Sequence, residues 1–127
     1  MILRQFKLSQ PEKDKLIRIK ARTGIQNWNV ICRWALCWSL AEPSIPGGLD
    51  PMSDSNVEMT WITFAGEHYE IYEAIIRQRC INDGLGDSQE VLIKYFRLHL
   101  SRGINHFSTR DVLRSCQDLL TYISAQE

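Results

Sequence analysis

The stretch that decides the fold runs from residue 4 to residue 40 and reads RQFKLSQPEKDKLIRIKARTGIQNWNVICRWALCWSL. Phe6 and Leu8 alternate with Gln5 and Lys7, which is the pattern of a short, half-buried strand. A basic helix, a glycine turn and a second, almost wholly apolar helix are predicted after it. A strand of this length is not stable alone, so it needs a partner, and the same strand of a second subunit is one candidate.

The first predicted helix has sequence signals at both of its ends. Ser9 and Glu12 match a capping box, with Pro11 in the first turn, where its missing amide hydrogen costs nothing. Gly24 stands where a left-handed C-cap belongs, so we expect the helix to end at about Thr23.

The basic side chains of this helix fall on two faces. Lys15, Arg18 and Arg22 follow the i, i+3, i+7 spacing and share one face, whereas Lys13 and Lys20 share another. The helix therefore offers a concentration of positive charge to an anionic partner.

The second predicted helix begins near Gln26 or Asn27 and ends at Glu42, before Pro43. It is apolar nearly all round, and such a helix must be buried all round. A domain of this size has few surfaces to cover it, so one interpretation is a subunit interface, and the other is a core helix wrapped by the C-terminal helices. The interface interpretation names Trp28, Ile31, Trp34, Ala35, Leu36 and Trp38.

Charge is distributed unevenly along a chain whose net charge is zero. Residues 1–41 hold eight basic and two acidic residues, a net charge of +6, and residues 42–127 carry the compensating −6. This asymmetry favours one face for an anionic partner, although a solvated basic helix neutralised by an acidic half is the alternative. The length predicts a single domain, residues 1–127, with a strand-helix-helix unit at 1–41 and a remainder at 57–127.

The second half of the sequence predicts mostly helices. A long proline- and glycine-containing loop, residues 42–56, precedes an alternating strand at 57–64. Helices are expected at about 67–82, from residue 87 or 88 to Gly103, and from about Ser108 onward. The predicted fold class is mainly α, a ribbon-helix-helix-like N-terminal unit plus C-terminal helices, with one or two short strands.

Few residues suggest catalysis. Phosphate-cradling and nucleophile-elbow motifs are absent, the three histidines are dispersed, and His99 lies on an apolar helical stripe where a structural role is expected. No zinc-type ligand spacing occurs, so we expect no catalytic residue, metal or cofactor. Cys32, Cys80 and Cys116 sit among apolar neighbours as free thiols would, and no signal peptide or bilayer-spanning run is evident. These features indicate a cytoplasmic protein with no membrane association.

Nucleic-acid binding explains more of the first forty residues. The basic helix can neutralise phosphates, and the turn before the second helix leaves free amides that suit an anion. Such contacts position a protein on duplex DNA without reading its sequence. The candidate DNA-binding residues are Lys7, Lys13, Lys15, Arg18, Lys20, Arg22, Gln26 and Asn27.

Two family resemblances follow from these residues. The strand, basic helix, Thr-Gly turn and the segment around Arg33 look like a ribbon-helix-helix unit, in which the strand pairs across a dimer and the second helix packs in the interface. The whole chain more closely resembles the DndE family of DNA sulfur-modification (phosphorothioation) proteins. That resemblance rests on the pattern from Phe6 through Lys7, Leu8, Ser9 and Gly24 into the tryptophan-rich second helix, and on total length.

The DndE resemblance implies a bacterial accessory protein of the system that replaces a non-bridging phosphate oxygen of DNA with sulfur. It implies a homotetramer that binds double-stranded DNA with a preference for nicked duplex. It also implies partners, namely a cysteine desulfurase, a PAPS-reductase-like sulfur-transfer protein and an SMC-type ATPase.

Two other functions stay open at this point. The protein could be an interaction scaffold that assembles the sulfur-modification complex without direct DNA contact, docking partners on its acidic half. A thiol-using sulfur carrier is a third class, which the apolar surroundings of the cysteines disfavour.

Overall fold

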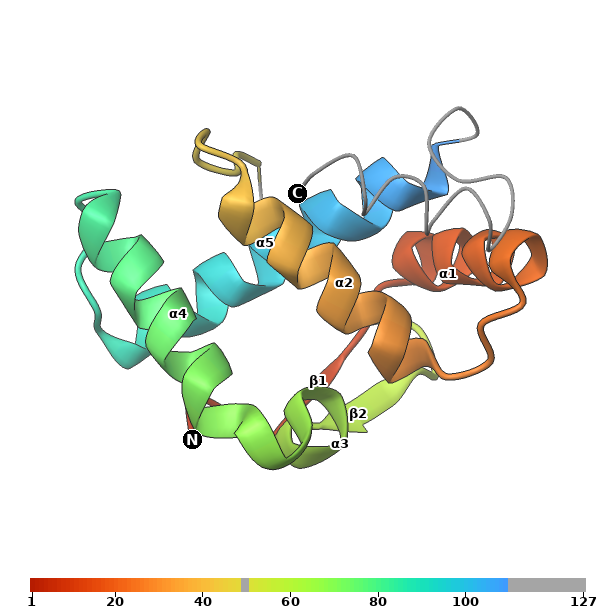
Figure 1. Ribbon diagram of the computed structural model, residues 1–127, viewed down its shortest axis with the longest axis horizontal. Coiled ribbons are helices and arrows are strands. Elements are labelled where there is room, and N and C mark those ends of the chain that lie inside the picture. Colours follow the sequence, from red (N-terminus) through yellow and green to blue (C-terminus); the bar gives the residue numbers. More distant parts are fainter. Residues whose placement is uncertain (49–50, 110–127) are drawn as a thin grey trace.

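The computed structural model describes residues 1–48 and 51–109 (Figure 1). Helices dominate it, and a two-stranded sheet lies beside them, so the predicted mainly α class is confirmed. The elements are β1 (Gln5–Lys7), α1 (Gln10–Thr23), α2 (Trp28–Ala41), β2 (Glu58–Thr60), α3 (Trp61–Ala65), a 3-10 turn η1 (Gly66–His68), α4 (Tyr69–Asn82) and α5 (Gln89–Ser108).

Both ends of α1 form as the sequence predicts. Ser9 Oγ accepts from the Glu12 amide at 3.2 Å, and Glu12 Oε1 accepts from the Ser9 amide at 2.8 Å. Gly24 adopts a φ of 77°, which lies in the left-handed region that glycine enters without steric cost. Its amide donates to the Lys20 carbonyl. The capping box and the glycine C-cap thus fix where α1 starts and where the chain turns into α2.

β1 finds its partner strand within the same chain. It pairs antiparallel with β2, with Gln5 opposite Thr60, Phe6 opposite Met59 and Lys7 opposite Glu58. β1 therefore has a strand partner inside one subunit, and the pairing of β1 with its own copy in a second subunit stays a prediction. The order strand, helix, turn, helix of the predicted N-terminal unit is present in the chain.

The second strand is shorter than predicted. The alternation over 57–64 continues past Thr60, yet Trp61–Ala65 forms α3. Thr60 causes this change, because its hydroxyl accepts from the Thr63 amide at 3.1 Å and caps the new helix. Trp61, Phe64 and Ala65 are then buried at helical spacing, against Phe96 and the other core rings.

The crossing of α2 and α5 forms the centre of the molecule. Gly103 of α5 lies against the Ala35 carbonyl, where a Cβ would approach well under 3.0 Å. Ile31, Ala35 and Leu36 are buried inside this one chain, at 3%, 0% and 0% exposure. For these three residues the predicted subunit interface is corrected: their surface is already covered, as in the alternative of a core helix wrapped by C-terminal helices.

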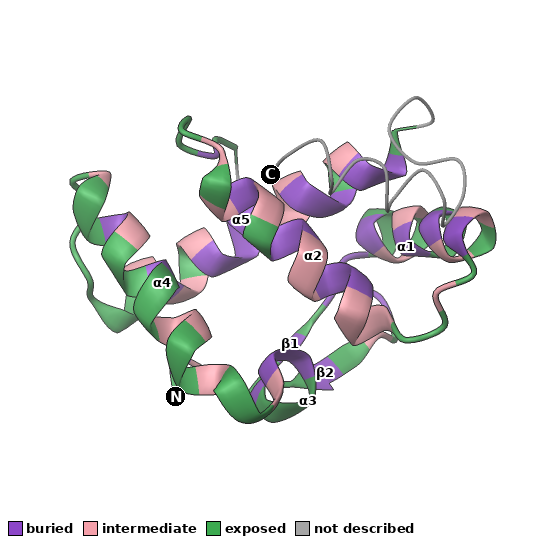
Figure 2. Ribbon diagram, viewed as in Figure 1, coloured by how far each residue is buried: buried purple, intermediate pink, exposed green. Residues whose placement is uncertain are grey.

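The tryptophans of α2 keep part of their surface. Trp28, Trp34 and Trp38 are partly buried and pack against the edge of the core. Trp38 stacks on the His106 ring, with centroids 3.8 Å apart. Figure 2 shows buried and intermediate residues alternating along α2. The interface prediction for these tryptophans stays a prediction.

The last described helix is longer than predicted. α5 continues through Gly103 to Ser108, because glycine there serves close helix packing rather than helix termination. The helix predicted from about Ser108 onward lies outside the described residues, apart from Ser108 itself, which ends α5. Among the helices of 1–48 and 51–109, none is long and apolar enough to cross a membrane.

Candidate nucleic-acid interface

α1 presents its basic residues along two edges. These edges flank its crest, which is the side of the helix that faces away from the core. Leu16 and Ile19 point into the core, at 0% and 1% exposure. At about 100° per residue, Lys15, Arg18 and Arg22 fall to one side of the crest, and Lys13 and Lys20 to the other. We call these sets the Arg18 edge and the Lys20 edge.

The Arg18 edge contains free and tethered cations. Arg18 is exposed, and Lys15 is half-buried. Arg22 is tethered, since its Nη1 donates to the Ser108 carbonyl at the end of α5 at 2.7 Å. A guanidinium has further N–H donors, so Arg22 can hold α1 against α5 and still present charge outward.

The Lys20 edge continues toward the start of α2. Lys13 Nζ donates to Asn56 Oδ1 at 2.6 Å, and Lys20 Nζ lies 4.6 Å above the Trp28 ring. The Trp28 contact is a cation–π arrangement that holds the ammonium near the α2 N-terminus. This edge and the α2 N-terminus therefore lie close together.

One of the first amides of α2 already has an acceptor, because the Val30 amide donates to the Asn27 carbonyl at 3.2 Å. Asn27 is the N-cap residue but makes no side-chain capping bond. The first amides of a helix have no acceptor within it, so they carry partial positive charge outward. Asn27 and Gln26 are exposed. The side-chain Nε2 of Gln26 donates to the Gly24 carbonyl at 3.3 Å.

Lys7 lies on the sheet and not on α1. It is exposed on β1, directly opposite Glu58 of β2. Cross-strand neighbours of opposite charge attract, so Glu58 offsets the field of Lys7. Lys7 also lines a pocket of about 370 Å³ together with Glu58 and Arg97.

One acid of α1 is neutralised inside the protein. Glu12 Oε1 accepts from Arg97 Nη2 at 3.1 Å, and the two side chains are only 2% and 8% exposed. Asp14 is then the acid that α1 leaves at its surface, beside five basic residues. The sequence did not predict Arg97 as the partner of Glu12, because the two residues are 85 positions apart and no local pattern in α5 indicates the contact.

The buried Ser39–His99 pair is the arrangement closest to a catalytic one. Ser39 Oγ lies 2.8 Å from His99 Nδ1 and accepts from Arg102 Nε at 2.8 Å. Both side chains are at most 1% exposed, so a substrate cannot reach them. Burial, and then the Arg102 and Arg79 charges, lower the pKa of His99 to about 4. These contacts fit a structural role at the C-terminus of α2.

The thiols are poorly placed for nucleophilic chemistry. Cys32 is fully buried, and burial, together with nearby Glu12, raises the pKa of its thiol. Cys37 is exposed, but partial burial still raises its pKa. Cys80 is also buried, as predicted, and Cys116 lies outside the described residues. Within 1–48 and 51–109, no three His, Cys, Asp or Glu residues come together as a metal site would require.

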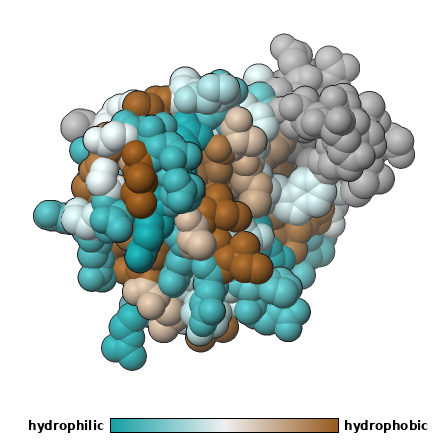
Figure 3. All heavy atoms as spheres, turned by 60° about the vertical axis from the view of Figure 1, so that its left-hand side comes forward, coloured by the Kyte–Doolittle hydropathy of each residue, from teal (hydrophilic) through white to brown (hydrophobic). Residues whose placement is uncertain are grey.

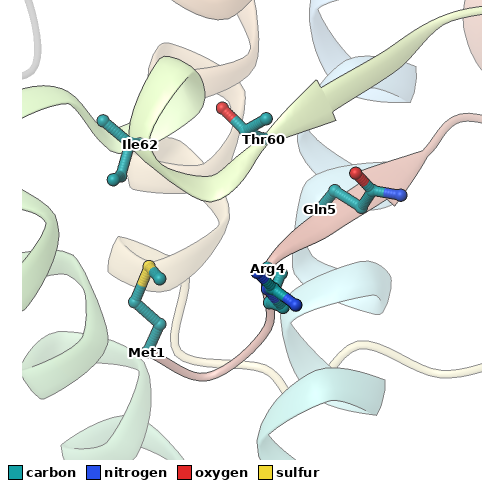
Figure 4. A pocket seen from close by; sticks show the side chains of 5 residues that line it. All are labelled: Met1, Arg4, Gln5, Thr60 and Ile62. Carbon is teal, nitrogen blue, oxygen red and sulfur yellow. The ribbon is translucent and has the colours of Figure 1, made fainter.

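A second pocket, of about 370 Å³, lies at the end of the sheet (Figure 4). Arg4 and Gln5 border it on one side and Thr60 and Ile62 on another, and Met1 completes the lining. Arg4 is its one ionisable side chain, so the lining offers no acid–base pair.

The fold and surface define a mainly α protein with a basic first helix and an intramolecular two-stranded sheet. The family model of the DNA sulphur modification protein DndE matches residues 5–115, which is most of the chain. The chain belongs to the DndE family. No curated protein sequence matches it.

Two solved structures share the fold. The crystal structure of DndE from Escherichia coli B7A, described as involved in DNA phosphorothioation modification, superimposes with a TM-score of 0.68 at 24% identity, covering 82% of this chain and 97% of that one. A glycine-to-lysine mutant of DndE, described as involved in DNA phosphorothioation, gives a TM-score of 0.63 at 21% identity, with 84% and 99% covered.

Proposed function

We propose that this protein is a non-enzymatic, DNA-binding component of the DNA sulfur-modification system. It binds duplex DNA through α1 and the start of α2, and it acts in the cytoplasm as an oligomer. Membership of the DndE family supports the pathway, and the surface of α1 supports the ligand.

The observation that carries the proposal is the imbalance of charge on α1. Five basic residues lie at its surface, whereas Glu12 is buried in an ion pair with Arg97. Removing an acid from the surface leaves a stronger positive field than the sequence alone suggests. Phosphates are the anions that a row of such side chains with neighbouring helix amides would neutralise.

The contacts position DNA rather than read its bases. Lysine and arginine side chains and helix amides bind phosphate oxygens, which carry no sequence information. Gln5 and Lys7 are the residues that base reading would need, but they lie on the short sheet and Lys7 faces Glu58. Binding is therefore expected to be independent of sequence, and the preference for nicked duplex is carried over from the family resemblance.

The proposal includes an oligomer and protein partners. The partly exposed tryptophans of α2 support self-association, and a tetramer is the assembly that the resemblance implies. The partners are a cysteine desulfurase, a sulfur-transfer protein and an SMC-type ATPase, which would supply the chemistry.

A charge-removal experiment tests the ligand. The variant Lys15→Ala/Arg18→Ala spares Arg22, which also holds α5, and should weaken binding to a fluorescent duplex by roughly 10- to 100-fold at 0.1 M salt. Lys13→Ala/Lys20→Ala tests the other edge. Lys94→Ala, an exposed lysine of α5, is the matched control. Equal affinities for all four proteins would refute the assignment of α1.

The alternative is a scaffold that assembles the sulfur-modification proteins without touching DNA. Exposed isoleucines on α4 favour it, since apolar surface is a common protein-docking feature. Absence of DNA binding at low salt, together with capture of a sulfur-modification partner, would support the scaffold.

A further inference from the structure

α4 turns apolar side chains outward. Ile71, Ile75 and Ile81 are 56%, 44% and 47% exposed. Together with exposed Ala74 they follow helical spacing on one side of α4, and we call this set the Ile71 face. Ile76 and Cys80, at 1% exposure each, occupy the opposite side and pack into the core.

This arrangement departs from that of an ordinary surface helix. Such a helix is polar on the side away from the core, because exposed apolar surface gains nothing from water. α4 carries isoleucine on both sides. Figure 2 shows α4 largely exposed, and Figure 3, in which the left-hand side of Figure 1 comes forward, shows hydrophobic residues among hydrophilic ones at that surface.

α4 also lies at the edge of the molecule. In Figure 1 it stands at the left, and α1 stands at the right. The last described residue, Thr109, is on the α1 side, where Arg22 binds the Ser108 carbonyl. Among the described residues, none of the other elements lies on the outer side of α4.

Two charges beside the Ile71 face indicate what covers it. Glu70 and Arg77 are exposed on the same flank of α4, and within the described residues neither forms an ion pair. They are seven residues apart, about 10 Å along the helix, which is too far to pair with each other. In an antiparallel pair of α4 helices, however, like flanks meet.

We propose that the Ile71 face packs antiparallel against the Ile71 face of a second copy of this chain, about a two-fold axis. The isoleucines of the two helices interdigitate, and Glu70 of each copy lies beside Arg77 of the other, so the ion pair forms twice. The inference gives the proposed oligomer a defined surface, but its test contains no DNA, so the two proposals can fail separately.

Light scattering and sedimentation of the full chain test the apolar part. Ile71→Lys/Ile75→Lys should raise the dissociation constant of self-association by roughly 100-fold or more. At a fixed concentration, the measured mass of the assembly should fall to half or to that of a monomer. Ile17→Lys, at an equally exposed isoleucine on α1, should leave the mass unchanged. A wild-type monomer at the highest soluble concentration, or an α4 variant of unchanged mass, would overturn the proposal.

A charge swap tests the antiparallel geometry and avoids substitutions that could affect folding. Glu70→Arg alone and Arg77→Glu alone each place like charges together and should weaken association, roughly tenfold. Glu70→Arg/Arg77→Glu restores opposite charges and should recover wild-type affinity. Failure of the double variant to recover, while its helix content equals that of the wild type, would rule out this pairing.

Discussion

At the scale of single residues, a cluster of polar groups joins the C-terminal end of α2 to α5 and α4. Arg102 donates to Ser39 Oγ and the Ser39 carbonyl, and both Arg102 and Arg79 donate to the Ser44 carbonyl. The bond to the Ser39 carbonyl serves the end of α2, where carbonyls lack donors within the helix, and the bonds to Ser44 hold the loop that follows α2. His99 completes the cluster as a neutral ring, because two arginines and burial oppose its protonation.

His99 should make stability depend on pH. The unfolded ring takes up a proton near its ordinary pKa of 6.5, whereas the folded ring does so only near 4. Between these values the unfolded state binds more protons, so stability falls as the pH falls. From pH 7 to pH 5 the loss from this residue should be about 2 kcal/mol. Urea unfolding at both pH values, compared with His99→Gln, measures it; an equal pH dependence in the variant would contradict this account.

Arg97 should be far more sensitive than a surface arginine. Arg97→Met leaves the Glu12 carboxylate buried without its partner, which costs about 3–5 kcal/mol. Arg18→Met, at an exposed position, should change stability by no more than about 0.5 kcal/mol. Chemical denaturation of both variants gives the comparison. A loss below about 1 kcal/mol for Arg97→Met would show that Glu12 finds other compensation.

Residue-level prediction from the sequence succeeded where partners are near in the chain. Ser9, Glu12 and Gly24 act within one or two turns, so local spacing reveals them. The Glu12–Arg97 and Ser39–His99 contacts join residues 85 and 60 positions apart, and only the folded chain brings them together. The hydrogen bond from Arg22 to the Ser108 carbonyl was not predicted for the same reason, because the two residues are far apart in the sequence.

At the scale of elements, Gly103 permits the close crossing of α2 and α5. A methyl group there would meet the Ala35 backbone, which cannot rotate away as a side chain can. Gly103→Ala should therefore cost about 3 kcal/mol despite the higher helix propensity of alanine. Asn105→Ala, on the exposed side of the same helix, should be neutral or slightly stabilising. Thermal unfolding distinguishes them, and a stabilised Gly103→Ala variant would show that the helices can separate at little cost.

The elements that were mispredicted share one cause. Glycine at 103 also fits a helix end, and the alternation at 57–64 also fits one long strand, so each local pattern is compatible with two structures. Tertiary packing decides between them: Gly103 gains a close helix contact, and Trp61 is buried at 0% exposure by turning into α3. The all-round apolarity of α2 likewise admitted both a core and an interface, and Ile31, Ala35 and Leu36 belong to the core.

At the scale of the whole molecule, charge and apolar surface lie on opposite sides. The basic α1 stands at one end of the structure and the exposed isoleucines of α4 at the other (Figure 1). Association through α4 would thus leave both α1 helices free for a ligand. The sequence predicted the basic face but not the α4 face, because its isoleucines resemble core positions until the fold places Ile76 and Cys80 inside.

The most direct test of the central claim is the salt dependence of DNA binding. Fluorescence anisotropy against intact, nicked and single-stranded DNA, from low to moderate salt, gives the slope of log affinity against log salt. Four or five phosphate contacts from α1 predict a slope of about −4 per DNA-bound chain, with the tightest binding to nicked duplex. A lack of binding at low salt, or an affinity that does not change with salt, would contradict a phosphate-binding role for α1.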